Sequence, residues 1–331
     1  MTHIVVDAMG GDNAPKAIVE GCVKAVSELD VKITLVGKED LIKECLGDYD
    51  CNKINVVNAS EIITNDDDPA KAIRRKNNSS IVVAMRLLED GIGDAFVSAG
   101  STGAVVSGAT LIVKRIKGVR RVAIGTVFPT PKKPTLLLDC GANADCTSEF
   151  LQQFAIMGNA YMQAVYNIER PAVALLNNGA EEHKGSLVYK ETHQLLKTMD
   201  LNFIGNIEGR DVFDSKADVV VADGFAGNIF LKTTEGTASF FSKKLKGLFM
   251  KNILTKMCAL ILKKGIKEFK SSFDYTEHGG APILGCQKVV IKAHGSSNAK
   301  AFYNAIRQAK HFYENGVIEA INNNLQKPLD E

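Results

Sequence analysis

The sequence lacks the features that mark secreted, membrane-spanning and broadly basic proteins. Its seven cysteines are odd in number and include no Cys-x-x-Cys pair, which indicates reduced thiols rather than a disulfide framework or a zinc ribbon. The longest notable apolar run, Met257 to Leu262, is far shorter than the ~18 residues of a membrane span. Forty Lys and Arg residues against 38 Asp and Glu leave a net charge of +2, so we expect no nucleic-acid partner.

Motifs of several enzyme classes are missing as well. The sequence has no G-x-x-x-x-G-K-[ST] phosphate loop, no G-x-G-x-x-G fingerprint after its first apolar run, no G-x-S-x-G elbow and no H-E-x-x-H pair. These absences disfavour phosphate-loop ATP chemistry, a serine hydrolase and a zinc enzyme. We therefore expect an activity that needs neither a metal nor a nucleophile supplied by the protein.

The composition is that of a globular protein with a sizeable core. The chain has 331 residues, of which 45% are hydrophobic and 24% charged. It enters the apolar run Ile4–Val6 without the charged, apolar and cleavage regions of a secretion signal, so we expect a cytoplasmic location. No low-complexity tract or long linker divides the chain, and we expect one catalytic α/β domain over residues 1–331.

One pattern recurs along the chain: a short β-branched or aliphatic run, a loop rich in Gly, Asn and Asp, and a stretch with helical periodicity. The predicted strands are Ile4–Val6, Asp94–Val97, Thr135–Leu138, Val173–Leu176 and Asp218–Val221. Alternating strands and helices at this spacing predict a mostly parallel sheet with helices on both faces, a three-layer α/β/α architecture. In such sheets ligands bind at the carboxyl ends of the strands, where the polar loops of this sequence follow.

Several of these loops suit an anion. Gly10 and Gly11 would let the backbone approach a ligand closely, and the segment Ser101–Gly103 precedes a helix whose free N–H groups favour phosphate. Other candidates are open to two interpretations. Lys184 is either a solvated surface lysine or an active-site cation, and His294–Asn298 either caps the last helix or contacts a ligand. The segment with Arg74, Lys76 and Ser79 is either an exposed turn and helix or a phosphate contact.

The stretch 236–272 departs from the pattern. It contains nine lysines and one acidic residue, interleaved with apolar residues at helical spacing, which predicts a protruding hairpin of two basic amphipathic helices. Three interpretations are open: a dimer interface, a surface that lies on an anionic membrane, or a docking site for an acidic partner. The apolar residues that we expect to make such contacts are Phe249, Ile253, Leu254, Met257, Leu260 and Ile261.

Taken in order, five loops resemble the motifs of one family. They are Asp7–Asp12, Ser98–Ala104, Leu138–Asn143, Asp223–Asn228 and Lys292–Ser297. Together they resemble the bacterial acyl-ACP:phosphate acyltransferases, the PlsX family, and the resemblance extends over about residues 3 to 315.

The resemblance implies a reaction in which acyl-ACP and inorganic phosphate give an acyl phosphate and free acyl carrier protein. It also implies a fold similar to those of isocitrate/isopropylmalate dehydrogenase and phosphate acetyltransferase, a homodimer, and no cofactor. The product would feed a membrane glycerol-3-phosphate acyltransferase in phospholipid synthesis, which suits a cytoplasmic protein that associates peripherally with the membrane.

The chemistry of that reaction suggests roles for the loop residues. Phosphate is itself the nucleophile and a thiolate is a competent leaving group, so the protein must position the dianion and stabilise the oxyanion. We expect Lys184 to neutralise charge, Asn228 to donate to the carbonyl oxygen and His294 to protonate the departing thiolate. The expected substrate-binding residues are Asp7, Gly10, Gly11, Asp12, Asn13, Arg74, Lys76, Ser79, Ser101, Thr102, Gly103, Asp139, Asn143, Asp223 and Ser296. Among them Asp7, Asp139 and Asp223 are expected to orient other groups.

Three other functions remain compatible with parts of the sequence. A phosphate acetyltransferase acting on acyl-CoA would keep the fold and change the donor. A nicotinamide-dependent dehydrogenase of the related fold would not need the missing fingerprint. A non-catalytic scaffold at the membrane would use residues 236–272 and leave the polar loops without a purpose.

Overall fold

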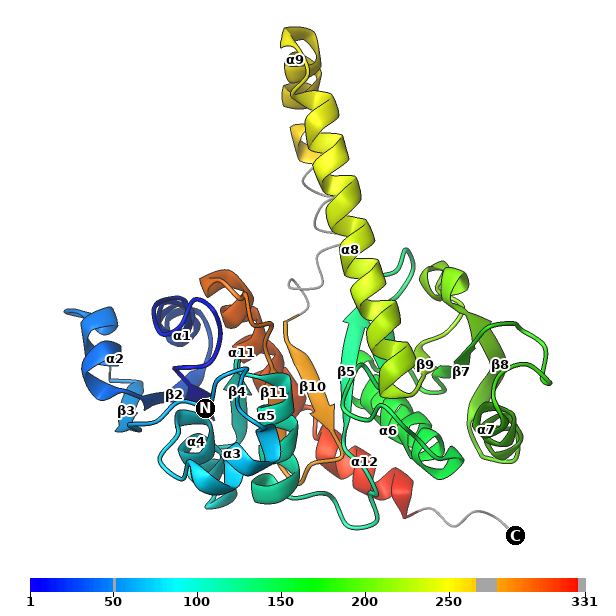
Figure 1. Cartoon of the computed structure of the whole chain (residues 1–331), viewed down its shortest axis with the longest axis horizontal. Helices are drawn as coiled ribbons and strands as arrows, with labels where there is room; N and C mark the ends of the chain where they lie inside the picture. Colours follow the sequence, from blue (N-terminus) through cyan, green and yellow to red (C-terminus); the bar gives the residue numbers. More distant parts are fainter. Residues whose placement is uncertain (50–51, 266–278, 327–331) are drawn as a thin grey trace.

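A computed structural model describes residues 1–49, 52–265 and 279–326. Within these residues the strands form one 11-stranded sheet in the order β3-β2-β1-β4-β11-β10-β5-β6-β9-β7-β8 (Figure 1). The strands are β1 (Thr2–Asp7), β2 (Val31–Gly37), β3 (Ile54–Asn58), β4 (Ala95–Ser98), β5 (Ala123–Phe128), β6 (Thr135–Leu138), β7 (Ala172–Asn177), β8 (Asn202–Glu208), β9 (Val219–Val221), β10 (Ala281–Leu284) and β11 (Val289–Lys292). The five predicted strands are confirmed as β1, β4, β6, β7 and β9.

Helices connect these strands. The α-helices are α1 (Lys16–Glu28), α2 (Glu39–Leu46), α3 (Pro69–Arg75), α4 (Ser80–Glu89), α5 (Thr102–Gly108), α6 (Ser148–Tyr166), α7 (Leu187–Lys197), α8 (Gly224–Phe249), α9 (Ile253–Ile261), α11 (Ala299–Glu314) and α12 (Val317–Leu325). A π-helical turn, Ala109–Val113, follows α5, and a 3-10 helix, Gly209–Asp214, follows β8.

Successive residues of the strands enter two hydrophobic clusters, one on each face of the sheet. In β1, Ile4 and Val6 join the cluster that contains residues of α1, α6, α11 and α12, whereas Val5 joins the cluster that contains residues of α4 and α5. Both faces of the sheet are therefore covered by helices, and the predicted α/β/α layering is confirmed.

The sheet is parallel except at its centre. β1, β2, β3, β4 and β11 run in one direction, and β6, β7, β8 and β9 run in the other. Between them β10 pairs antiparallel with both β11 and β5, and β5 pairs antiparallel with β6. The sequence pattern predicts only the parallel halves, because it carries no signal for this central reversal.

The register of the central strands brings the carboxyl ends of both halves to one level. Lys292, at the end of β11, pairs with Ala281 at the start of β10. Two residues further along β10, Ile283 pairs with Ile124 of β5, and the next residue of β5 pairs with Leu138 at the end of β6. The loops that follow β4 and β11 therefore face those that follow β6 and β9 across the two central strands.

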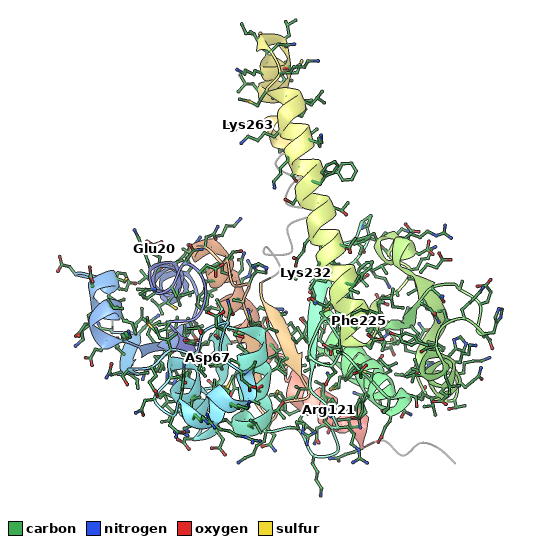
Figure 2. The ribbon with its side chains drawn as sticks, viewed as in Figure 1. Glu20, Asp67, Arg121, Phe225, Lys232 and Lys263 are labelled. Atoms are coloured by element: carbon green, nitrogen blue, oxygen red, sulfur yellow. The ribbon has the colours of Figure 1, made fainter. Side chains whose placement is uncertain are left out.

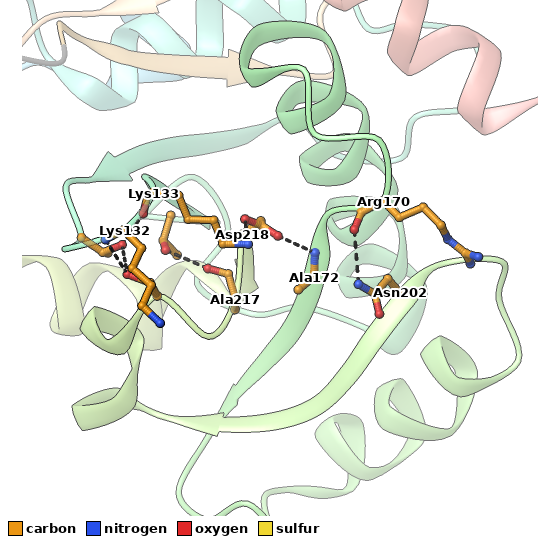
Figure 3. Close-up of polar contacts among 10 residues, drawn as sticks. Lys132, Lys133, Arg170, Ala172, Asn202, Ala217 and Asp218 are labelled. Carbon is orange, nitrogen blue, oxygen red and sulfur yellow. Dashed lines mark hydrogen bonds and ion pairs between the residues drawn. The ribbon is translucent and has the colours of Figure 1, made fainter.

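Figure 3 shows contacts that hold together the amino ends of strands in the half of the sheet formed by β6, β7, β8 and β9. The buried carboxylate of Asp218 accepts a 2.7 Å hydrogen bond from the backbone N–H of Ala172 and forms an ion pair with Lys133. Beside it the hydroxyl of Thr135 donates to the carbonyl of Ala217 at 2.8 Å. These contacts join the starts of β6, β7 and β9 at the edge away from the motif loops.

Helix α8 projects from the body and carries α9 at its far end (Figure 1). Its 26 residues correspond to ~39 Å at 1.5 Å per residue. The helix begins at Gly224, well before the predicted start at residue 236, because Asp223 caps it by accepting the Ala226 N–H at 2.7 Å. Residues 266–272 of the predicted hairpin lie outside the described residues.

Candidate active site

A cavity of about 340 Å³ lies where the carboxyl ends of the two halves face each other. Figure 2 shows Lys232, one of its lining residues, at the base of α8 above the central strands. The lining residues come from both halves of the sheet and are Thr102, Ile124, Thr126, Val127, Cys140, Gly141, Asn228, Leu231, Lys232, Glu235, Gly279, Gly280, Ala281, Lys292, Ala293 and His294. All but the first of the five motif loops supply residues to this cavity.

The first motif loop contacts the second motif loop through the carboxylate of Asp7. Its carboxylate is buried, accepts the Ser98 hydroxyl at 2.7 Å and accepts the Met9 N–H at 3.1 Å. Ser98 in turn accepts the Gly100 N–H at 2.9 Å. A Cβ on Gly10 would lie 2.5 Å from both an Asp7 carboxylate oxygen and the Gly100 nitrogen, so this close approach requires glycine. Burial raises the pKa of Asp7, and its contacts hold the first and second motif loops together outside the cavity lining.

The first and last motif loops are joined directly. The Asp12 N–H donates to the Gly295 carbonyl at 2.8 Å, and the Asn13 side chain donates to the carbonyls of Ser296 and Ser297 at 3.3 and 3.2 Å. These contacts place the predicted residues Asp12, Asn13 and Ser296 beside the cavity. The N-cap of α11 is Asn298, which accepts the Ala301 N–H at 2.9 Å, so the capping interpretation of the segment His294–Asn298 is confirmed for its last residue.

Asp139 organises the loop after β6. Its buried carboxylate accepts backbone N–H groups from Ile124, Gly141, Ala142 and Asn143 at 2.8 to 3.2 Å, and the Asn143 side chain at 2.9 Å. Burial raises its pKa, and these donors oppose that rise because they favour the carboxylate. With these partners Asp139 holds the conformation of the loop, and its role in orienting the reacting groups stays a prediction.

The base of α8 is anchored to the same loop. The Gly224 N–H donates to the Asn143 carbonyl at 2.7 Å, and a Cβ on Gly227 would lie 1.9 Å from the Asp139 carbonyl oxygen. The carboxylate of Asp223 accepts the Tyr189 hydroxyl at 2.6 Å. This packing places Asn228 beside Gly141, where a Cβ would be 3.5 Å from Asn228 Cγ.

Positive charge gathers in the cavity. Lys292 is only 9% exposed, and its ammonium donates to the Ala293 carbonyl. Burial, followed by the charge of Lys232, lowers the pKa of Lys292 to about 8. The same two causes lower the pKa of His294, whose Nδ1 lies 2.8 Å from Ser296 Oγ. At neutral pH the imidazole is therefore neutral.

Other predicted residues lie elsewhere. The half-buried Lys184 does not line the cavity; its carbonyl accepts from the Asn177 side chain at 3.2 Å in the loop after β7. Lys76 forms an ion pair with Asp67 at 2.7 Å, and the buried Ser79 donates its hydroxyl to the Lys76 carbonyl. Arg74 lines a separate cavity of about 260 Å³. The structure does not bring these four residues together with Asn228 and His294.

Sequence reasoning missed Lys232, Glu235 and Lys292. Two signals were available: Lys232 and Glu235 follow Asn228 by four and seven residues, the spacing of one helix face, and Lys292 begins the motif that contains His294. Glu235 Oε2 lies 2.8 Å from Lys232 Nζ. In the part of the chain that the structure describes, no group of three His, Cys, Asp or Glu side chains could hold a metal ion.

The fold is shared with several solved enzymes. A phosphotransacetylase from Streptococcus pyogenes superposes with a TM-score of 0.63 at 17% identity, covering 96% of this chain and 94% of that chain. A branched-chain phosphotransacylase from Enterococcus faecalis gives 0.58 at 16% identity, covering 95% and 99%. A 4-hydroxythreonine-4-phosphate dehydrogenase from Klebsiella pneumoniae gives 0.53 at 13% identity, covering 95% and 100%. The predicted likeness to the phosphate acetyltransferase fold is confirmed.

Sequence comparison identifies the family to which the chain belongs. The chain belongs to the fatty acid synthesis protein family, whose model matches residues 2–320. A phosphate acyltransferase from Clostridium botulinum (strain Loch Maree / Type A3) is 49% identical over 325 residues, 97% of each chain. One from Thermoanaerobacter pseudethanolicus is 46% identical over 330 residues, 99% of each chain. The resemblance of the five loops is thus confirmed at the level of the family.

Proposed function

We propose that this protein transfers the acyl group of acyl-ACP to inorganic phosphate, giving an acyl phosphate and the free carrier thiol. The observation that carries the proposal is the cavity that the motif loops form, where Asn228 and His294 lie with two lysines. Relatives named phosphate acyltransferase that are 49% and 46% identical to this chain support phosphate as the acceptor. The acyl carrier protein as donor is the finer part of the proposal.

The role proposed for Asn228 is to stabilise the oxyanion. Its position on the first turns of α8 is fixed by the contacts of Asp223, Gly224 and Gly227 with the loops beside them. A side-chain amide held in this way can donate to the thioester carbonyl oxygen as negative charge develops there.

His294 can move the one proton that the reaction must relocate. As an oxygen of HPO₄²⁻ forms the new C–O bond and the C–S bond breaks, the phosphate proton must leave and the thiolate sulfur must gain one. The neutral imidazole can take up that proton at one ring nitrogen and pass it to sulfur; its Nδ1 accepts the Ser296 backbone N–H at 3.2 Å and lies 2.8 Å from Ser296 Oγ. Its lowered pKa suits this start as a base.

Lys184 keeps its proposed role in charge neutralisation, although it does not line the cavity. The loop that carries Lys184 leads into α7, and the Tyr189 hydroxyl of that helix donates to the carboxylate of Asp223 at the base of α8 at 2.6 Å. Lys184→Ala should lower turnover severely and leave the melting temperature unchanged. Near-normal turnover would remove Lys184 from the site.

The tip of α8 and α9 is proposed to contact the membrane where the product is consumed by a glycerol-3-phosphate acyltransferase. Among the described residues no helix combines the length and apolarity needed to cross a bilayer. α9 buries none of its residues, and Ile253, Leu254, Leu260 and Ile261 are 71–82% exposed. Met257 is also exposed, whereas Phe249 is half-buried. Exposed apolar residues among lysines fit a peripheral membrane contact.

A homodimer is proposed to cover the side of α8 away from the cavity. An apolar groove of about 520 Å³ runs there, lined by Phe213, Phe230, Thr233, Thr234, Thr237, Ala238, Phe241 and Ser242. A second copy of this helix is the expected occupant. Light scattering should report a dimer that Phe241→Glu weakens and Phe240→Glu, outside the groove on the same helix, weakens less. Equal effects would contradict this interface.

The donor is tested by presenting the same acyl group on two carriers. Purified protein with phosphate should release thiol from long-chain acyl-ACP much faster than from the matching acyl-CoA. Preference for acyl-CoA would favour a phosphate acetyltransferase-like enzyme, and no turnover with either donor would favour the scaffold.

A further inference from the structure

Two cations of the cavity have no part in the mechanism above. Lys292 ends β11 in the first half of the sheet, and Lys232 stands on α8 in the second half. Both line the cavity, together with Asn228 and His294. The cavity therefore receives one lysine from each half of the sheet.

Lys292 is a buried cation without a close anion. The described residues include no carboxylate within ion-pair distance of its ammonium, which donates to the Ala293 carbonyl. Asp7 and Asp12 act on it only from a distance, and their effect is smaller than those of burial and of Lys232. A charge buried in this way is costly unless an anion compensates it.

Lys232 adds to that cost. Its ammonium lies 2.8 Å from Glu235 Oε2, and its positive charge lowers the pKa of both Lys292 and His294. Glu235 also lines the cavity, so an incoming anion must compete with this carboxylate for Lys232. A dianion between the two ammonium groups would relieve their repulsion more fully than a monoanion would.

We propose that Lys292 and Lys232 form the phosphate subsite of the cavity, with one cation supplied by each half of the sheet. This rests on the proposed function, which makes inorganic phosphate a substrate. Lys292 is the fixed, buried contact, and Lys232 exchanges Glu235 for the phosphate.

The subsite has a protonation signature that a purely structural lysine would lack. Bound HPO₄²⁻ favours the charged ammonium, so it raises the pKa of Lys292 above its free value of about 8. Near pH 8.5 much of the free enzyme carries a neutral Lys292, and phosphate binding should then take up protons from solution.

Calorimetry with inorganic phosphate near pH ~8.5, in two buffers of different ionisation enthalpy, measures both affinity and proton uptake. Wild type should bind with net proton uptake. Lys292→Arg should bind with little uptake, because arginine stays charged, and Lys292→Met should bind at least ~10-fold more weakly. Lys232→Met should also weaken binding. Lys190→Met, an exposed lysine of α7, is the control and should match wild type.

Thermal unfolding separates this role from a structural one. Phosphate should raise the melting temperature of wild type and not that of Lys292→Met, whose own melting temperature without phosphate should not fall. Wild-type phosphate affinity in Lys292→Met, or no proton uptake by wild type, would overturn the subsite. Because these readouts need no acyl donor, their failure is distinguishable from a failure of wild type to form acyl phosphate, which would overturn the proposed function alone.

Discussion

The two ends of α8 differ in packing and in exposure. At its base the helix is capped by Asp223, hydrogen-bonded to the loop after β6, and packed so closely that Gly227 has no room for a Cβ. At its far end it carries α9, which has no buried residue. Chemistry requires the fixed geometry of the base, whereas contact with a lipid surface requires only exposed apolar area and charge. We propose that this one helix serves two functions, which substitutions should separate.

The largest effect is expected at the base. Asn228→Leu removes the proposed oxyanion donor and should lower kcat by about 10²- to 10³-fold. Steady-state kinetics measure this, while vesicle binding and the circular dichroism spectrum should not change. A loss of vesicle binding in the same variant would show that the two ends are not independent.

At the tip, Leu254→Glu combined with Ile261→Glu should reduce sedimentation with anionic vesicles by ~10-fold or more, because two exposed apolar side chains are lost. The KM for phosphate should stay at the wild-type value. Leu187→Glu, at a 72% exposed leucine of α7, is the matched control and should bind vesicles normally. Unchanged sedimentation of the double variant would count against the membrane contact.

The pH dependence of the KM for phosphate should come from the cavity at the base of α8 and not from the tip of this helix. Lys292 is charged below its pKa of about 8, so phosphate binding is strong there and weakens as pH rises. Well above that pKa the KM for phosphate should increase by up to ~10-fold per pH unit. Lys292→Arg should flatten this rise. An equal rise in both proteins would assign the ionisation to another group.

Substitutions at two glycines of α8 test how tightly the helix is packed at its base and nine residues further along it. Gly227→Ala would place a Cβ 1.9 Å from the Asp139 carbonyl oxygen and should destabilise the fold by about 1–3 kcal/mol. Gly236→Ala has no neighbour within 4 Å and should stabilise the helix by roughly 0.5–1 kcal/mol. Chemical unfolding measures both, and equal stabilities would refute the described packing.

The smallest effect is expected at Cys140, which lines the cavity. Burial raises its pKa to about 12, so the thiol stays protonated and unreactive at neutral pH. Cys140→Ser should change kcat by less than ~2-fold. A large loss of activity, with covalent acylation of the wild-type thiol, would replace direct attack by phosphate with an acyl-enzyme route.

Local sequence patterns predicted the strands and the polar loops that follow them, because residues close in sequence determine these elements. The runs around Val5 and Val220 formed strands, and the polar loops after them lie at the carboxyl ends, because strand propensity and turn chemistry act over a few residues. The antiparallel pairing of β5 and β10 could not be predicted in this way, since it depends on register between segments about 160 residues apart.

The same limit applies to the site. Asn228, His294 and Thr102 were predicted from their loops and line the cavity. Lysine is a residue type expected to bind phosphate, yet Lys76 forms an ion pair with Asp67. The positions of these two residues in the sequence did not reveal that contact. Conversely, Lys292 resembles the end of an ordinary strand until the fold places it opposite Lys232.

Direct attack of phosphate on an acyl thioester is the reaction that we propose for this cavity. The most direct test is incubation of purified protein with long-chain acyl-ACP and radiolabelled inorganic phosphate, with parallel measurement of carrier thiol and labelled acyl phosphate. We predict that both products form in equal amounts, only when phosphate is present. Thiol release that continues without phosphate, or that leaves no label on the acyl product, would contradict the account.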